Sequence, residues 1–126
     1  MRPFRDEGRD APPAETTMTT RFVLTDAQTR QIALGRFVRL GPLFGGIVVG
    51  RAGGAWRAYK NECRHRALPL DLGGPSPSSD DGRFLLCHQH GALYRPEDGW
   101  CFAGPCAGEK LEALPIRQDG DVLEIG

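Results

Sequence analysis

Two short segments rich in metal-ligand residues decide how this sequence is interpreted: Cys63-Arg64-His65 and, after twenty-one intervening residues, Cys87-His88-Gln89-His90-Gly91. Each follows a segment with the character of a β-strand, so each is expected to form a turn at a strand end. Two such turns facing each other would supply two thiolates and two imidazoles. That is a complete ligand set for a metal centre.

Short strand-like segments bounded by Gly, Pro or Asp surround both turns. Two of the connections, Gly53-Gly54 and Gln118-Asp119-Gly120, are typical of β-hairpins. Many short strands joined by such turns favour an all-β fold, a small antiparallel barrel or sandwich that carries the two ligand-bearing loops. The strands are predicted at residues 21–24, 36–40, 46–49, 55–59, 84–86, 111–117 and 121–125.

Three other segments are predicted to lack strands. Residues 1–20 are polar and contain three prolines, so we interpret them as a disordered arm, with Met18 as an alternative start of translation. Residues 26–34 are predicted to form a short helical turn. Residues 73–82 are rich in Gly, Pro, Ser and Asp and are predicted to be a surface loop that buries no apolar side chain. Residues 21–126 are then expected to form a single domain.

The composition excludes several classes of function. The 126 residues carry 16 basic and 16 acidic side chains, so no excess positive charge attracts nucleic acid or an anionic membrane. The most apolar segment, residues 43–49, is far shorter than the ~20 residues that cross a bilayer as a helix. The first twenty residues contain no apolar run suited to a signal peptide. We therefore expect a cytoplasmic protein that binds neither nucleic acid nor membrane.

The paired segments resemble the signature of the Rieske [2Fe–2S] family, C-x-H followed at a distance by C-x-x-H and usually by Gly. The continuation over residues 90–94, then Asp98-Gly99 and Gly104-Pro105, is also similar to the segment found in that family. The resemblance implies a β core of six or more strands from which two loops project one [2Fe–2S] cluster per chain.

The same resemblance assigns the cluster ligands. It implies that Cys63 and Cys87 hold an inner iron, and that His65 and His90 hold an outer iron nearer to solvent. Because two neutral imidazoles replace two thiolates, the oxidised cluster carries less negative charge than a four-cysteine cluster, and its reduction potential is higher. The class spans roughly −150 to +300 mV.

Several positions separate this sequence from the quinol-oxidising members of the family. Those members place a serine where this chain has Ala92, and they carry two further cysteines, joined as a disulfide, where this chain has Leu68 and Gln89. The resemblance is therefore to the soluble ferredoxin or oxygenase type. Tyr94 occupies a position where family members often place a tyrosine whose hydroxyl approaches a ligand sulfur, although an ordinary core role remains open. We expect a reduction potential in the lower half of the class range.

Three further potential ligands lie close to the two segments. His88 would shorten the second box to C-H, which leaves too little chain for both side chains to reach adjacent irons, so His90 is preferred and His88 is interpreted as a surface histidine. Cys101 and Cys106 could form a tight disulfide or bind another metal. Since no histidine or acidic partner was identified for them, we interpret them as reduced structural thiols.

The resemblance implies an electron carrier that passes single electrons from a reductase to an oxygenase or another terminal oxidoreductase. With three histidines in all, the chain cannot also supply the two-His, one-carboxylate iron site of an oxygenase. It is therefore expected to be an electron-transfer component and to have no catalytic residues of its own. Two alternatives remain: a small Rieske-like subunit of a larger enzyme such as a nitrite reductase, or a structural Cys₂His₂ zinc module.

Overall fold

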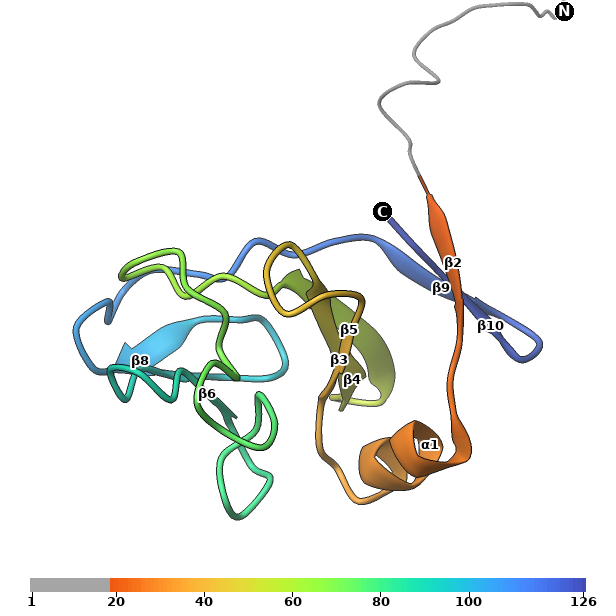
Figure 1. The fold of residues 1–126 in the computed structure, drawn as a ribbon, viewed down its shortest axis with the longest axis horizontal. Helices are drawn as coiled ribbons and strands as arrows, with labels where there is room; N and C mark the ends of the chain where they lie inside the picture. The colour runs from red at the N-terminus through yellow and green to blue at the C-terminus, as the bar shows by residue number, and fades with distance from the viewer. Residues whose placement is uncertain (1–18) are drawn as a thin grey trace, which may run out of the picture.

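A computed structural model describes residues 19–126, which fold into three small antiparallel sheets and one helix (Figure 1). The sheet of β3, β4 and β5 lies between the other two in this view. The predicted all-β antiparallel fold is confirmed. The strands are β2 (Thr20–Val23), β3 (Val38–Leu40), β4 (Ile47–Ala52), β5 (Ala55–Lys60), β6 (Leu85–Leu86), β7 (Leu93–Tyr94), β8 (Cys101–Ala103), β9 (Ile116–Asp119) and β10 (Val122–Ile125).

The first sheet, in the order β2-β10-β9, joins the two ends of the described chain. Leu123 at its centre pairs with Phe22 on one side and with Gln118 on the other. The hairpin was predicted to turn at residues 118–120. Gln118 and Asp119 are still paired strand residues, and the chain reverses at Gly120, whose φ of 62° suits a glycine. The preceding residues, 111–115, do not belong to strand β9.

The second sheet, in the order β3-β4-β5, is buried on both faces. Its β4–β5 hairpin turns at Gly53-Gly54, as predicted, with φ values of 62° and 78° that suit a tight two-residue turn. Neighbouring residues of a strand point to opposite faces. Val48 and Val49 are nevertheless both fully buried, so apolar side chains cover this sheet on each side.

Two hydrophobic cores therefore lie on opposite sides of strand β4. The first core surrounds the candidate site, and the second lies toward the terminal sheet and the helix. The first core comprises Phe37, Val48, Tyr59, Cys63, Leu70, Leu85, Cys87, Ala92, Tyr94, Cys101, Cys106 and Leu111. The second core comprises Ile32, Val38, Leu40, Val49, Ala58, Leu123 and Ile125.

Helix α1 (Asp26–Ala33) corresponds to the predicted helical turn. It begins at a capping box in which the Thr25 side chain accepts a hydrogen bond from the Gln28 backbone, and the Gln28 side chain accepts one from the Thr25 backbone. Ile32 is its buried residue and joins the second core. The residues that the structure describes include no helix that is both long and apolar enough to cross a membrane.

The third sheet, in the order β6-β7-β8, carries the second ligand segment. Of its strands only β6 was predicted. Strands β7 and β8 were not predicted, because they are only two and three residues long and lie among Gly and Pro turns.

The segment 73–82 is a loop without a strand, as predicted, but it does not lie wholly on the surface. Pro77 and Ser78 are buried. The Ser78 hydroxyl accepts a hydrogen bond of 2.9 Å from the Phe37 backbone N–H, and the Pro77 carbonyl accepts one of 2.9 Å from Leu86. The expectation that this loop buries no apolar side chain was wrong, because Pro77 is buried and the polar groups of the loop find partners at Phe37 and in strand β6.

The predicted N-terminal arm falls mostly outside the described residues, as does Met18. Strand β2 already begins at Thr20, one residue before the predicted boundary.

Candidate metal centre

The first ligand segment forms a tight turn shortly after β5. The Ala67 N–H donates to the Cys63 carbonyl at 2.6 Å, and the Cys63 N–H donates to the Leu68 carbonyl at 2.7 Å. Ala67 has a φ of 56°, and no other non-glycine among residues 19–126 has a positive φ. The two hydrogen bonds close the turn through both the N–H and the carbonyl of Cys63. The closed turn requires the unfavourable positive φ of Ala67.

The second ligand segment directly follows β6 and leads into β7. The Gly91 N–H donates to the Cys87 carbonyl at 2.8 Å, and the Cys87 N–H donates to the Ala92 carbonyl at 2.9 Å. Gly91 has a φ of 75°, which accounts for the glycine that follows the second box. Both segments thus lie on turns after strands, as predicted.

Hydrogen bonds join the second ligand segment to the chain that follows the first. The His88 N–H donates to the Leu70 carbonyl at 3.0 Å, and the Gln89 side-chain amide donates to the Leu72 carbonyl at 2.8 Å. These two hydrogen bonds therefore fix the position of one turn relative to the other.

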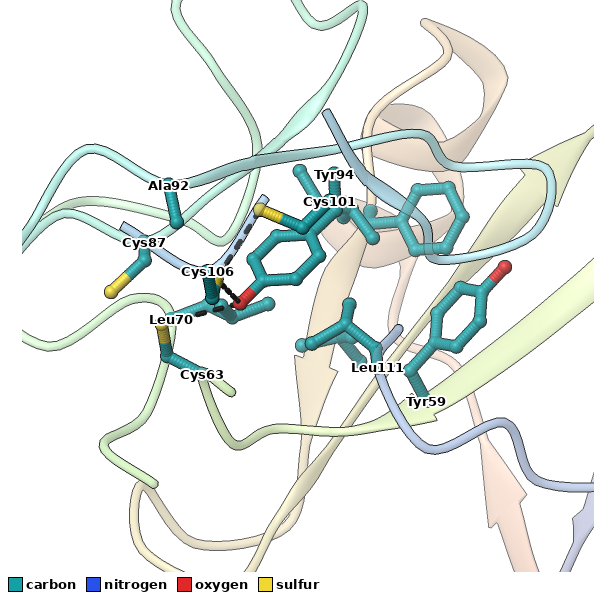
Figure 2. Close-up of a cluster of buried hydrophobic side chains, with 12 residues drawn as sticks. Tyr59, Cys63, Leu70, Cys87, Ala92, Tyr94, Cys101, Cys106 and Leu111 are labelled. Atoms are coloured by element: carbon teal, nitrogen blue, oxygen red, sulfur yellow. Dashed lines mark hydrogen bonds between the residues drawn. The ribbon is translucent and has the colours of Figure 1, made fainter. Parts of the chain in front are cut away.

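The four predicted ligands separate into a buried thiol pair and an exposed imidazole pair. Cys63 and Cys87 are 1% and 0% exposed and lie at one edge of the first core (Figure 2). His65 and His90 are exposed, and their ring centroids lie 4.6 Å apart with the rings nearly perpendicular. Within residues 19–126, no group of three or more His, Cys, Asp or Glu side chains converges on a point that could hold a single metal ion.

Each of the two thiols shifts the pKa of the other. The neighbouring Cys87 thiol lowers the pKa of Cys63 to about 5, with smaller contributions from the Tyr94 hydroxyl and the backbone N–H groups of His65 and Arg66. The neighbouring Cys63 in turn raises the pKa of Cys87, and burial raises it further. Because the thiolate is the form of cysteine that binds metal, the lowered pKa of Cys63 favours a metal-binding role.

Tyr94 combines the two roles that the sequence left open. It is a fully buried member of the first core, and its hydroxyl lies 3.3 Å from Cys63 Sγ. The same oxygen accepts a hydrogen bond of 3.0 Å from the Arg64 backbone N–H and lies 3.0 Å from Cys106 Sγ. Burial raises the pKa of Tyr94, so the hydroxyl keeps its proton and can donate it to a sulfur.

A buried polar network supports the first turn, and sequence reasoning missed it. Asn61 accepts a hydrogen bond of 2.8 Å from the Leu70 N–H and donates one of 2.9 Å to Asp71. Arg39 completes the network with a 2.9 Å ion pair to Asp71. Arg39 is distant in sequence from the other members, and no motif indicated that these residues meet.

His88 is not a surface histidine. It is half-buried, its Nε2 lies 2.7 Å from the Ser76 carbonyl, and a Cβ added to Gly74 would come within 2.4 Å of its ring. The prediction failed because it considered only the turn, whereas the loop 73–82 folds over this side chain. The Nε2 atom of the ring is therefore occupied by its contact with that loop.

The Gly104-Pro105 segment forms a third wall of the site. Gly104 has a φ of 97°, and a Cβ there would lie 2.7 Å from the Ala92 Cα. The glycine therefore permits the chain after β8 to contact the second ligand segment directly.

All four cysteines are free thiols. Cys101 and Cys106 are buried like the two in the boxes, and their sulfurs lie 3.2 Å apart. They are reduced and buried, as expected of structural thiols, and Cys106 also contacts the Tyr94 hydroxyl.

Comparisons with known proteins agree with this architecture. The profile of the family described as Rieske [2Fe-2S] domain matches residues 19–117. No curated protein matches the sequence.

Among solved structures, the chain is similar to the ferredoxin of carbazole 1,9a-dioxygenase from Nocardioides aromaticivorans IC177. The identity is 20%, the TM-score is 0.59, and the match covers 85% of this chain and 97% of that one. It is also similar to a chain from a complex of reduced oxygenase and oxidised ferredoxin of carbazole 1,9a-dioxygenase, at 20% identity and a TM-score of 0.56, covering 73% of this chain and 89% of that one.

A third similar chain comes from a fluorene-bound oxygenase variant in complex with ferredoxin, again of carbazole 1,9a-dioxygenase. The identity is 22%, the TM-score is 0.64, and the match covers 86% of this chain. This chain spans only 28% of that longer one. At these identities the likeness shows the fold.

The match to the family profile extends over most of the chain, and it therefore establishes the family to which the chain belongs. The chain belongs to the Rieske [2Fe–2S] domain family and carries one [2Fe–2S] cluster. The donor set on the two joined turns fits that group, since it offers two buried thiols and two imidazoles at the surface.

Proposed function

We propose that Cys63 and Cys87 hold the inner iron of the cluster, that His65 and His90 hold the outer iron, and that the protein is a one-electron carrier. The observation that carries this proposal is the pairing of two buried, adjacent thiols with two exposed imidazole rings 4.6 Å apart. The buried thiols would hold one side of the cluster away from water, whereas the exposed imidazoles would hold the other side near the surface, where it can exchange electrons with a partner.

The bound cluster supplies a single site that gains and loses one electron. The chain contributes neutral imidazoles, backbone N–H groups directed at both cysteine sulfurs, and the Tyr94 hydroxyl. These groups stabilise added negative charge and so set the reduction potential. Because Ala92 contributes no hydroxyl, we expect a potential in the lower half of the class range.

The proposed partners are a reductase that donates electrons and an oxygenase or another terminal oxidoreductase that accepts them. Supporting this, the chain matches 97% of the length of a carbazole 1,9a-dioxygenase ferredoxin. Arg64 and Arg66 are exposed on either side of His65, and Arg64 lies 3.8 Å from Glu109. Exposed cations beside the outer histidines would orient an acidic surface of the partner. We further propose a cytoplasmic location and no binding to nucleic acid or membrane.

Substitution of the histidines tests the ligand assignment. Protein reconstituted anaerobically with iron and sulfide should contain acid-labile sulfide, absorb visible light and give a paramagnetic signal when reduced. His65→Ala and His90→Ala should each lose that signal. His88→Gln is the matched control, because glutamine can keep the bond to Ser76, and it should retain the signal. A cluster that survives His90→Ala but not His88→Gln would refute the assignment.

The same preparations test the alternatives. A colourless protein with one bound zinc would favour the structural zinc module. Co-purification of the chain in a stable complex with a large enzyme would favour a permanent subunit. A chain that is reduced by a ferredoxin reductase and reoxidised by a terminal oxygenase at catalytic rates would support the free carrier.

A further inference from the structure

The second pair of cysteines forms a contact that the proposed ligand set does not use. Cys101 lies at the start of β8, and Cys106 lies in the turn that follows it. Their sulfurs are 3.2 Å apart, roughly 1.1 Å further than bonded sulfurs, and the side chains are 0% and 6% exposed. Both thiols are reduced in the structure.

The backbone holds this pair face to face. The Cys101 N–H donates to the Glu109 carbonyl at 2.7 Å, and the Gly108 N–H donates to the Cys101 carbonyl at 2.9 Å, so the chain closes on itself around the pair. Inside this loop, the Ala107 N–H donates to the Gly104 carbonyl at 3.2 Å. Small side-chain rotations would bring the sulfurs to bonding distance without opening the loop.

A chain of hydrogen bonds leads from this pair to Cys63 (Figure 2). The Cys101 thiol donates to the Ala103 carbonyl at 3.2 Å, and the Cys106 thiol donates to Cys101 Sγ. With the Cys106 hydrogen used in this way, Cys106 Sγ is an acceptor for Tyr94. The single hydroxyl hydrogen of Tyr94 therefore has two competing acceptors, Cys106 Sγ at 3.0 Å and Cys63 Sγ at 3.3 Å.

We propose that Cys101 and Cys106 are a dithiol–disulfide couple whose oxidation state is transmitted through Tyr94 to Cys63. The transmission rests on the proposed role of Cys63 as an iron ligand, whereas the couple itself does not. The oxidant is a small-molecule disulfide such as oxidised glutathione. Two S–H bonds break and one S–S bond forms, and the two electrons and two protons convert the oxidant into two thiols.

Oxidation of the pair would change the hydrogen bonding at Cys63. A disulfide sulfur is a poorer acceptor than a thiol held at 3.0 Å by the present geometry, and closing the bond draws Cys106 Sγ toward Cys101. The Tyr94 hydrogen would then be donated to Cys63 alone. A stronger hydrogen bond to a ligand sulfur favours the reduced cluster, so the reduction potential should rise.

Burial makes the exchange slow. Burial raises the pKa of Cys106 to about 11, so little of it is the reactive thiolate near neutral pH. The couple must therefore be tested at equilibrium.

The experiment uses the cluster-loaded full chain, incubated anaerobically in glutathione buffers of increasing oxidised fraction until no further change occurs. Alkylation and peptide mass mapping should show a disulfide between Cys101 and Cys106, with Cys63 and Cys87 unlinked. Voltammetry on the same samples should show a positive shift of the cluster potential that follows the disulfide fraction and reverses with dithiothreitol.

Three variants separate the couple from its transmission. Cys106→Ser and Cys101→Ala should form no disulfide and show a potential that is independent of the glutathione ratio. Tyr94→Phe should still form the disulfide but lose the shift. The inference is overturned if wild-type protein shows no disulfide even in fully oxidised glutathione, or if the disulfide forms without a shift. Failure to bind a cluster would instead refute the proposed function, and mass mapping would still report on the couple.

Discussion

At the scale of single residues, the site is defined by which group donates to which sulfur. Tyr94 is central because it is fully buried, keeps its proton and lies 3.3 Å from Cys63 Sγ. The family resemblance implied that the hydroxyl of Tyr94 approaches a ligand sulfur, with an ordinary core role left open. Only the folded chain shows that Arg64 and Cys106 hold the same hydroxyl in place.

Tyr94→Phe should lower the reduction potential of the cluster. The substitution removes one hydrogen bond to the sulfur of Cys63, a proposed ligand, and a change of about 1 kcal/mol between the two oxidation states corresponds to a shift on the order of 40 mV. Protein-film voltammetry measures it. Tyr59→Phe is the control, since Tyr59 is buried in the same core but donates to the Pro96 carbonyl at 2.7 Å, so its potential should be unchanged. Equal shifts in both variants would contradict the role of Tyr94.

At the scale of elements, short turns rather than strands hold the site together. The segment after β8 contacts the second ligand segment at Gly104, where a Cβ would lie 2.7 Å from the Ala92 Cα. Gly108, at the end of the same loop, has a similar φ of 95° but nothing within 4 Å of an added Cβ. Substitutions at the two glycines therefore distinguish the effect of backbone strain, which both positions share, from the effect of steric contact with the site, which only Gly104 makes.

Gly104→Ala should destabilise the protein more than Gly108→Ala and should also disturb the cluster. Both variants place alanine in a left-handed conformation, at a cost of about 1–2 kcal/mol. Only Gly104→Ala also pushes against the backbone of the second ligand segment. Thermal unfolding and the spectrum of the reduced cluster provide the measurements. If Gly108→Ala altered that spectrum as much as Gly104→Ala, contact with Ala92 would not be the cause.

The turn between β7 and β8 should respond to acid. A hydrogen bond from Arg95 holds the pKa of Asp98 at about 2, helped by a hydrogen bond from the Trp100 N–H. An unfolded aspartate has a pKa of about 3.9. Since the folded pKa is the lower one, this stabilisation is present above about pH 4 and is lost as the pH falls toward about 2.

Comparison of wild type with Asp98→Asn over that range measures the effect. The difference in their free energies of unfolding should narrow as the pH falls. The carboxylate is partly exposed, so the difference should be small and should shrink further in high salt. A difference that is constant from pH 5 to pH 2 would show that the charge of Asp98 contributes nothing.

At the scale of the whole molecule, the protein has two hydrophobic cores separated by one sheet. Val48 and Val49 are neighbours in β4, and both are fully buried, but Val48 belongs to the first core and Val49 to the second. The first core also contains Cys63 and Cys87, so it both stabilises the fold and positions the site.

Val48→Ala and Val49→Ala should destabilise the protein by similar amounts, about 1.5–3 kcal/mol each, because each leaves a cavity in a packed core. Only Val48→Ala should also speed the loss of the cluster, since it loosens the core that contains the two cysteines. Denaturant unfolding and the decay of visible absorption after addition of a chelator measure the two effects. Faster loss in Val49→Ala than in Val48→Ala would contradict this division.

Local signals in the sequence were sufficient to predict the family, the fold class and several turns of this protein. The spacing of Cys63, His65, Cys87 and His90 indicated the family, and the turn at Gly53-Gly54 and the helix near Asp26 were predictable because hairpin and capping preferences act over a few residues. The antiparallel all-β fold followed from the same short-range rules.

Tertiary structure alone decided what depends on residues distant in the chain. It buried Ser78 against Phe37, enclosed His88 beneath the loop 73–82, and joined Asn61 to Arg39 through Asp71. It also linked Cys101 and Cys106 to Cys63 through Tyr94. A hydrogen bond between such residues forms only when two distant chain segments pack together. The order of residues within either segment does not reveal which other segment it will contact.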